Sequence, residues 1–294
     1  ILDIQPGDEV ILPSYTFVST ANAFALRGAT IKFADIVMDN LCLSLEHIKQ
    51  LLSRKTKAIV AVHYAGISTN LIALKEICDE NNVFLIEDNA QGICSTYLDQ
   101  PLGSFGQLAC LSFHETKNIS CGEGGALLIN DPKFLHAAEV VREKGTNRSQ
   151  FFRGEIDKYT WVGLGSSFLP SEISSAFLYA QLKACEHITS ERLKIWNIYY
   201  DIFSRWESSG ILSRPIIPSD SIHNAHMFYV LFNSSQCQKL FIQKMRDHGI
   251  HCTFHYIPLH SSPQGIALSP NSDDSDFPIT NFVSSHIVRL PLWI

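Results

Sequence analysis

The sequence predicts an α/β fold in which a mainly parallel sheet is flanked by helices, with a smaller α+β domain at the C-terminal end. Up to about residue 180, short apolar runs typical of buried strands alternate with segments whose apolar residues recur at helical spacing. Such strand–helix–strand units form parallel sheets that are covered on both faces. A long helical stretch then precedes a mixture of strands and one helix. We therefore expect a large domain over residues 1–185 and a small domain over residues 186–294.

The elements of the large domain follow one another in regular order. Each predicted strand is a short run of apolar and often β-branched residues. The predicted strands cover residues 9–14, 30–36, 58–64, 83–88, 108–113 and 126–130. The predicted helices between the first four strands cover residues 16–28, 43–53 and 70–82. Gly28 ends the first helix, because glycine readily adopts the left-handed conformation that closes a helix.

The small domain is predicted from a less regular pattern. An aromatic-rich stretch over residues 181–210 is predicted to be one long helix. Strands are predicted over residues 226–232 and 252–256, and a helix over residues 236–249. Residues 267–278 are polar and rich in turn-forming residues, which predicts a loop.

The composition is that of an ordinary globular protein. Of 294 residues, 46% are hydrophobic and 18% are charged, and the net charge is −6. These values argue against disorder and give no general attraction to nucleic acid or to an anionic membrane surface. No apolar run reaches transmembrane length, and the cytoplasm is the expected location.

The eight cysteines form no CxxC pair and have no metal-ligand spacing. Several lie in apolar runs, as Cys110 does, where a thiol packs as a small hydrophobic group. We therefore expect neither a metal site nor a disulfide framework. The chain begins and ends within apparent structural elements, so we expect the natural protein to extend beyond both ends.

Polar side chains follow two predicted strands at their carboxyl ends, where ligands bind in open parallel sheets. Asp88 ends one strand and Gln91 follows it, whereas Ser112 ends another strand and Lys117 follows it. A lysine can form a Schiff base with the aldehyde of pyridoxal 5'-phosphate, and a carboxylate can keep the pyridine nitrogen of this cofactor protonated. Taken alone, the composition and spacing indicate an α/β enzyme and do not select this cofactor.

A set of motifs in a fixed order does select it. The motifs are HYAG (63–66), EDNAQG (87–92), SFHETKN (112–118) and GEGG (122–125). In this order they resemble the DegT/DnrJ/EryC1/StrS family of sugar aminotransferases, which implies the fold type I architecture of pyridoxal-phosphate enzymes. The resemblance covers almost the whole chain.

Three longer segments resemble one subgroup of that family, the enzymes that act on dTDP-4-oxo-6-deoxy-D-glucose. They are PSYTFVSTANAFALRGA (13–29), REKGTNRSQFFRGEIDKYTW (142–161) and GSSFLPSE (165–172). The resemblance implies transfer of an amino group from L-glutamate to C4 of this sugar. The expected product is dTDP-4-amino-4,6-dideoxy-D-galactose, which is used in surface polysaccharides such as lipopolysaccharide.

The resemblance also implies roles for individual residues. Lys117 forms the Schiff base with the cofactor and, once released, moves the proton during transamination. Asp88 pairs with the pyridinium nitrogen, and Gln91 lies on the side of the ring oxygen. Ser112 binds the phosphate, and Phe17 stacks on the cofactor ring.

Further residues are expected near the substrate. His114 and Glu115 flank Lys117 and face the sugar or hold the loop. Other expected substrate residues are Arg148, Arg153 and Lys158 near the nucleotide diphosphate, and Tyr256 and His260 from the small domain. Ser166 and Ser167 are expected to reach the site of a neighbouring subunit, because the family builds its sites at a homodimer interface. His63 is expected to be structural.

The sequence departs from the family pattern in two places. Upstream of residue 1 the family has a helix whose N-terminus binds the cofactor phosphate. That helix and the final helix of the small domain are both expected to be missing from this sequence. Phosphate affinity, dimer formation and activity of this chain are therefore open questions, and an inactive fragment is one interpretation.

Three rival interpretations remain. A pyridoxal-phosphate sugar 3-dehydratase has histidine in place of the Schiff-base lysine, and Lys117 argues against it. A non-catalytic paralogue that binds a nucleotide sugar would form no Schiff base. A dinucleotide-binding dehydrogenase is disfavoured because no GxGxxG motif follows the early strands. An aminotransferase acting on another nucleotide-linked keto sugar is a further alternative.

Overall fold

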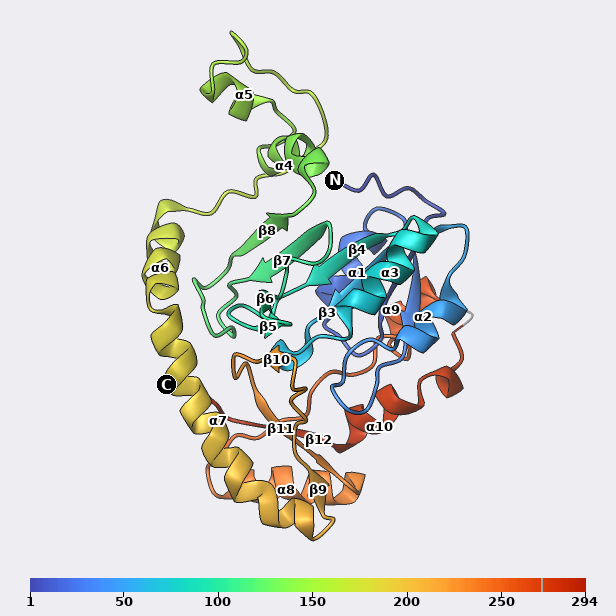
Figure 1. Ribbon diagram of the computed structural model, residues 1–294, viewed down its shortest axis with the longest axis vertical. Coiled ribbons are helices and arrows are strands. Elements are labelled where there is room, and N and C mark those ends of the chain that lie inside the picture. The colour runs from blue at the N-terminus through green and yellow to red at the C-terminus, as the bar shows by residue number, and fades with distance from the viewer. Residues whose placement is uncertain (271) are drawn as a thin grey trace.

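A six-stranded sheet forms the centre of the computed structural model, which describes residues 1–270 and 272–294 (Figure 1). The strand order is β2-β1-β3-β4-β7-β8. The first five strands are parallel, and β8 pairs antiparallel with β7. Their bounds are Glu9–Pro13 (β1), Thr30–Ala34 (β2), Thr56–Val62 (β3), Phe84–Asp88 (β4), Leu108–Ser112 (β7) and Gly125–Ile129 (β8). The predicted mainly parallel sheet is therefore confirmed.

Helices cover both faces of this sheet. Because side chains alternate along a strand, Ile11 points to one face while its neighbours on β1 point to the other. Helix α1 (Val18–Ala25) packs on the second of these faces. Helices α2 (Leu45–Leu51) and α3 (Leu71–Asn81) pack on the face that contains Ile11. This arrangement leaves the carboxyl ends of the parallel strands at one edge.

Two smaller sheets and the remaining helices complete the structure. One sheet consists of β5 (Thr96–Tyr97), β6 (Gln100–Pro101) and β10 (Ser221–Ile222), and the other of β9 (Leu212–Ser213), β11 (Phe228–Phe232) and β12 (Ile287–Leu290). The other α-helices are α4 (Leu135–Arg142), α5 (Arg148–Phe152), α6 (Glu172–Lys183), α7 (Cys185–Ser208), α8 (Ser235–Asp247), α9 (Pro263–Leu268) and α10 (Pro278–His286). Short 3₁₀ helices span Tyr64–Gly66 (η1), Pro132–Phe134 (η2) and Asp274–Asp276 (η3). Among the described residues, no helix is both long and apolar enough to cross a membrane.

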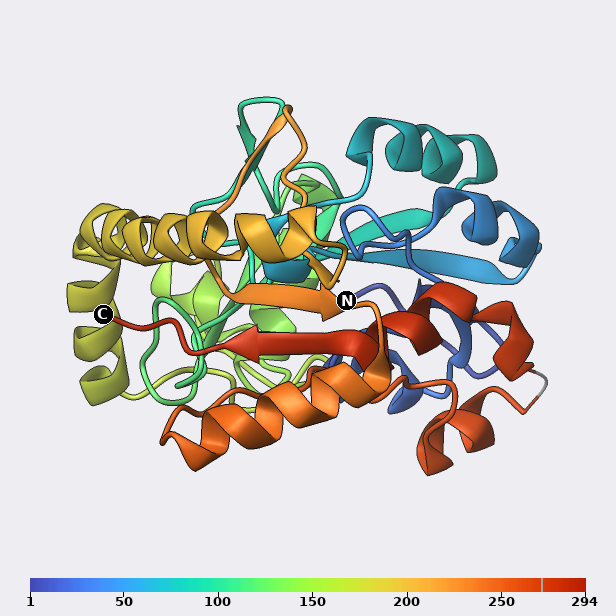
Figure 2. The same ribbon diagram turned by 90° about the horizontal axis from the view of Figure 1, so that it is seen from below.

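The sheet of β9, β11 and β12 is packed on both faces. Phe228 and Val288 lie in a cluster with Trp196 of α7, and Phe241 of α8 packs against the same cluster. Figure 2 shows β11 and β12 between these two helices. The opposite face joins the large sheet, because Tyr229 and Ile287 share a cluster with Tyr15 and Tyr64.

Hydrogen bonds also join the beginning of the chain to its end. Oγ of Ser14 lies 2.6 Å from Nδ1 of His260. The Asp35 carboxylate accepts hydrogen bonds from the amide and hydroxyl of Thr280, at 2.8 and 2.6 Å, and from the amide of Ile279. These contacts fix the start of α10 against the strand that ends at Ala34.

Two predicted elements differ in the structure. The stretch over 181–210 is not one helix, because Ala184 separates α6 from α7 with non-helical backbone angles. Residues 252–256 form no strand; a single bridge from Thr253 to Arg289 is followed by backbone that directs two aromatic rings inward. The predicted domain boundary falls at the first residue of α7 and remains a prediction. In the predicted loop over 267–278, residue 271 lies outside the described residues.

The expectation about cysteines also needs correction. Cys94 and Cys185 form a disulfide, although 91 residues separate them. The loop after β4 packs beside the start of α7, and this contact could not be read from cysteine spacing. Cys110 was expected to be internal, but its side chain is exposed on β7. No cluster of three or more potential metal ligands occurs in the described part of the chain.

Candidate active site

The carboxyl ends of β4 and β7 are adjacent in the sheet, and Asp88 pairs in register with Cys110. The Asp88 carboxylate accepts a 2.6 Å hydrogen bond from Thr20 Oγ1 and a longer one from the amide of Ala90. Thr20 lies on α1, so that helix fixes the orientation of the carboxylate. Thr20 was not singled out from the sequence, since its partner is 68 residues away.

Glu87 points the other way, into a fully buried network. Its carboxylate accepts a 2.8 Å hydrogen bond from Nε2 of His63 and three more from the amides of Gly103, Phe105 and Gly106. Burial tends to raise the pKa of Glu87, but the bonds from His63 and these amides outweigh it and hold the pKa below 4.5. The contacts of His63 are those of a structural residue.

Gln91 connects the large sheet to the residues that follow α8. Its Oε1 accepts a 2.7 Å hydrogen bond from the amide of Ala65, and its Nε2 donates to the hydroxyl of Tyr256 at 2.9 Å. Burial is the largest cause that raises the pKa of Tyr256 to about 12, and the charge of Asp88 adds to it. Phe17 lies beside Tyr256 with ring centroids 6.4 Å apart. The structure thus brings together four of the predicted residues: Phe17, Asp88, Gln91 and Tyr256.

Lys117 lies in the loop after β7 and is partly buried. Its amide donates to the carbonyl of His114 at 2.9 Å, which closes a turn. Burial is the largest influence on its side chain and lowers the pKa of Lys117; the charge of Asp88 raises it and that of Arg289 lowers it. A lysine whose amine loses its proton more readily is a better nucleophile.

Ser112 and His114 are partly buried, as Lys117 is. Ser112 ends β7, and its hydroxyl accepts a 3.4 Å hydrogen bond from the amide of His114. Nδ1 of His114 lies 2.9 Å from Oγ1 of Thr116, and its Nε2 lies 3.5 Å from Glu123. Glu115 is exposed. The contacts of His114 are therefore local to the loop.

The predicted diphosphate residues lie apart from this site within one chain. They belong to a segment with α4 and α5 that projects from the sheet (Figure 1). Arg153 is engaged by the carboxylates of Glu139 and Glu155, each with a contact of 2.6 Å. Arg148 packs over the ring of Phe152, 4.8 Å from its centroid. Lys158, like Ser166 and Ser167, is exposed.

His260 also differs from its expected position. Its Nδ1 contacts Ser14, its Nε2 lies 3.0 Å from Asp274, and its ring stacks on Phe277 at 3.9 Å. Both ring nitrogens are therefore already partnered. The expectation that His260 faces the substrate does not agree with this geometry.

His255 is a further buried residue that sequence reasoning missed. Its Nδ1 is 2.7 Å from the hydroxyl of Tyr64, and its ring stacks on Tyr256 at 3.7 Å. Burial, the largest cause, lowers the pKa of His255 well below 6.5, so the ring is neutral at pH 7. The motif HYIPLH drew attention to its neighbours Tyr256 and His260 only.

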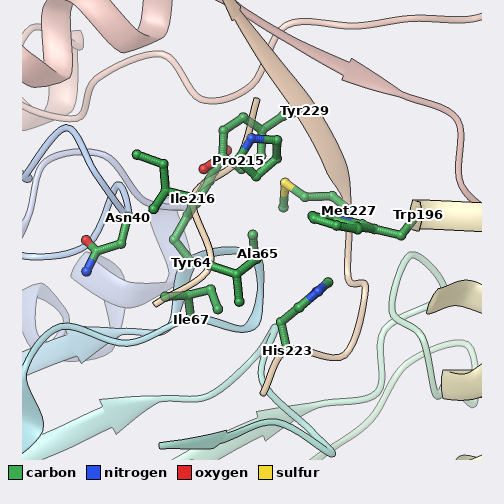
Figure 3. A pocket seen from close by; sticks show the side chains of 11 residues that line it. Asn40, Tyr64, Ala65, Ile67, Trp196, Pro215, Ile216, His223, Met227 and Tyr229 are labelled. Atoms are coloured by element: carbon green, nitrogen blue, oxygen red, sulfur yellow. The ribbon is translucent and has the colours of Figure 1, made fainter. Parts of the chain in front are cut away.

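A small cavity lies behind Tyr64 and Ala65, on the side of the residues that precede β11 (Figure 3). Trp196, His223 and Met227 contribute to its wall. It has room for about one water molecule and contains no residue predicted to bind the cofactor. The cavity therefore belongs to the packing between the two parts of the chain.

Comparison with known proteins identifies the family. The model of the DegT/DnrJ/EryC1/StrS aminotransferase family matches residues 1–294. The chain belongs to this family. It is therefore a sugar aminotransferase that depends on pyridoxal 5'-phosphate.

Similar proteins support the assignment. A dTDP-4-dehydro-2,3,6-trideoxy-D-glucose 4-aminotransferase from Saccharopolyspora spinosa is 29% identical over 268 residues, which are 90% of this sugar aminotransferase and 69% of the relative. The aminotransferase TlmJ from Streptoalloteichus hindustanus is 26% identical, with a TM-score of 0.88 over 99% of this chain and 76% of that chain. PseC from Helicobacter pylori, an aminotransferase of pseudoaminic acid biosynthesis, is 25% identical, with a TM-score of 0.88 over 98% and 75% of the two chains.

The residues at the strand ends of the sugar aminotransferase fit its cofactor. The oriented carboxylate of Asp88 suits a protonated pyridine nitrogen, and the amine of Lys117 suits the aldehyde. The Ser112 hydroxyl can donate to a phosphate, since its one hydrogen bond among the described residues is as an acceptor. The ring of Phe17 is 57% exposed and can cover one face of the cofactor.

Proposed function

We propose that the chain transfers an amino group from L-glutamate to C4 of dTDP-4-oxo-6-deoxy-D-glucose, forming dTDP-4-amino-4,6-dideoxy-D-galactose for surface polysaccharide. The observation that carries the proposal is the position of Asp88 at the carboxyl end of β4 and of Lys117 in the loop that follows the adjacent strand β7. The 4-aminotransferase from Saccharopolyspora spinosa, whose name specifies a dTDP-linked 4-keto sugar, supports C4 as the position.

Each residue of the site has a task in this proposal. When bound, pyridoxal 5'-phosphate would supply the aldehyde carbon that carries the amino group between donor and acceptor, and a ring that acts as the electron sink. Asp88, held by Thr20, keeps the ring nitrogen protonated. Lys117 holds the cofactor at rest and, once free, carries a proton at its Nζ atom. Ser112 binds the phosphate, and Phe17 excludes water from one ring face.

Two remaining residues orient the bound molecules. Gln91, fixed at both ends of its amide, lies on the side of the ring oxygen. Tyr256 bonds to Gln91 and covers the site from the small domain. His114 and Glu115 stay candidates for the sugar, because they flank Lys117.

The proposal includes a homodimer in which the projecting segment reaches the site of the partner. Residues 161–182 expose many large apolar side chains, and soluble monomers rarely expose so much apolar surface in one segment. These are Trp161, Val162, Leu164, Phe168, Leu169, Ile173, Phe177, Tyr179 and Leu182. Helix α6 has no buried residue in the single chain. A second copy of the chain would cover this surface and bring Arg148, Lys158, Ser166 and Ser167 to a second site.

An absorbance spectrum of the purified chain with pyridoxal 5'-phosphate tests the proposal. We expect a visible Schiff-base band that is absent in Lys117→Ala, is retained in Lys75→Ala on the exposed face of α3, and bleaches with L-glutamate. The aminated enzyme should then convert dTDP-4-oxo-6-deoxy-D-glucose, with the configuration at C4 read by NMR. A folded chain without the band would instead favour the non-catalytic paralogue, and conversion of a different keto sugar would revise the substrate.

A further inference from the structure

Strand alternation places the side chain of Arg289 on the face of β12 that points to the active site. Val288 and Leu290 lie in the cluster with α7, whereas Ile287 lies in the cluster with Tyr15 and Tyr64. Side chains two residues apart share a face, so Arg289 projects on the same side as Ile287. Its backbone bridge to Thr253 brings it next to the segment that contains His255 and Tyr256.

The guanidinium of Arg289 has no protein partner among the described residues. Its Nε is buried and makes no hydrogen bond, and no carboxylate of residues 1–270 or 272–294 lies within 4.0 Å of the group. Arg192 provides the contrast within the same part of the fold. Arg192 is buried as a whole, and it donates to the carbonyls of Ala225, His226 and Leu292 at 2.9 to 3.0 Å.

Arg289 is partly buried, and a cation in such a position without a counter-ion is unfavourable, because the charge loses part of its hydration and gains no compensating contact. The surrounding side chains offer none, since Tyr15, Tyr64 and His255 are neutral at pH 7. The arrangement therefore suits an anion supplied by a ligand. A carboxylate matches a guanidinium particularly well, because two parallel hydrogen bonds can form.

The position of Arg289 relative to Lys117 identifies which anion fits. Arg289 bridges Thr253, and Tyr256 of the same segment accepts a hydrogen bond from Gln91, which follows Asp88. The charge of Arg289 accordingly contributes to lowering the pKa of Lys117. An amino-acid donor carries its α-carboxylate on the carbon bonded to the nitrogen that replaces Lys117. The other anions lie elsewhere: the cofactor phosphate is assigned to Ser112, and the sugar diphosphate is attached at C1, across the ring from the reacting C4.

We propose that Arg289 binds the α-carboxylate of the amino donor. This inference rests on the proposed aminotransferase function and assigns the donor site to a residue of the small sheet. It predicts that substitution of Arg289 affects one half of the reaction and not the other. Arg289 contributes to the step in which the donor delivers its amino group, and it makes no contact in the step in which the keto sugar receives it.

Single-turnover measurements on Arg289→Gln and Arg289→Lys test this prediction, with Arg205→Gln on the exposed face of α7 as control. Loss of a charged hydrogen-bonding partner should raise the apparent Kd for L-glutamate by roughly 10- to 100-fold in Arg289→Gln. Arg289→Lys, which keeps the charge, should lose less. Formation of the Schiff-base band and the rate with the keto sugar should change less than about twofold, which also shows that the variants fold. Reaction with benzylamine, a donor without a carboxylate, should be equally slow in all variants.

Binding of glutarate, measured by calorimetry, examines the same contact without turnover. The unmodified protein should bind this dicarboxylate more tightly than Arg289→Gln does. The inference would be overturned if Arg289→Gln bound glutarate and glutamate as tightly as the unmodified protein does. A defect confined to the keto sugar would assign Arg289 to the diphosphate, and a lost Schiff-base band would assign it to the cofactor; either result also overturns it. If glutamate never bleaches the unmodified protein but glutarate binding still depends on Arg289, the proposed function fails while the carboxylate site stands.

Discussion

Thr20 Oγ1 donates a 2.6 Å hydrogen bond to Oδ2 of Asp88. Both the hydroxyl and its second neighbour, Oγ1 of Thr16 at 3.0 Å, come from the segment that begins α1. The bond occupies one lone pair of the carboxylate and fixes its plane. The oxygen atoms of Asp88 are therefore held in place before any cofactor arrives.

Replacing Thr20 by valine removes this donor while preserving the shape of the side chain. We expect Thr20→Val to weaken cofactor binding and lower kcat by roughly 5- to 30-fold, equivalent to about 1–2 kcal/mol for one hydrogen bond to a charged group. Cofactor titration and steady-state kinetics measure both quantities. Ser19→Ala, at the exposed neighbouring position, is the control. Normal kinetics in Thr20→Val would show that Asp88 needs no such support.

The sequence allowed prediction of those features that depend on neighbours along the chain. The strands of the large sheet are largely continuous apolar runs; Asp88 ends one of them, and Lys117 lies in the loop after another. The break at Ala184 contains neither glycine nor proline, so it depends on how α6 and α7 pack and not on local propensity.

Contacts between distant segments could not be predicted in this way. The bond from Thr20 to Asp88 spans 68 residues, and Arg289 faces the site only because β12 pairs with β11 in a particular register. The projecting segment shows a related difficulty. Its arginines were expected at the diphosphate, yet in one chain Arg153 binds two carboxylates instead.

The buried Glu87 predicts how stability depends on pH. Its folded-state pKa lies below the ordinary value of 4.5, so its ionisation stabilises the fold above that value and the contribution is lost as the pH falls through the folded pKa. Glu87→Gln places an amide NH₂ group against backbone donors and should cost about 1–3 kcal/mol at pH 7. Urea denaturation at pH 7 and pH 4 should show the difference shrinking at the acidic pH. Glu76→Gln on the exposed face of α3 should unfold like the parent, and a difference for Glu87→Gln that did not vary with pH would contradict the assignment.

The exposed apolar face of α6 predicts that a single substitution there prevents dimer formation. Ile173 is 85% exposed in the single chain, and an aspartate there would have to be desolvated in a dimer. We expect the parent to sediment as a dimer of 32.9 kDa chains and Ile173→Asp to sediment as a monomer at micromolar concentration. Leu240→Asp, at a position of α8 that is 50% exposed, should remain dimeric. A monomeric parent would refute the proposed homodimer.

The disulfide between Cys94 and Cys185 predicts a redox-dependent stability. It joins the loop that follows Gln91 to the first residue of α7, and closing a loop of this length restricts the unfolded chain. Reduction, or the substitution Cys94→Ser, should lower the free energy of unfolding by about 2–4 kcal/mol. Thermal denaturation with and without a reductant measures the effect. Cys237→Ser, at an exposed free thiol, serves as control; equal melting of reduced and oxidised protein would argue against the bond.

The carboxylate of Asp35 has a consequence for biosynthesis. Three of its hydrogen bonds come from Ile279 and Thr280, which a ribosome adds about 245 residues later. The hydrogen bonds of Ser14 with His260 and of Tyr64 with His255 likewise form only after the later residue has been synthesised. The large sheet therefore cannot reach its final packing until Ile279 and Thr280 have left the ribosome, and its interface with the small sheet stays uncovered until β12 has emerged. Such long-range closure slows folding, which makes the nascent chain a natural client for chaperones that shield apolar surface.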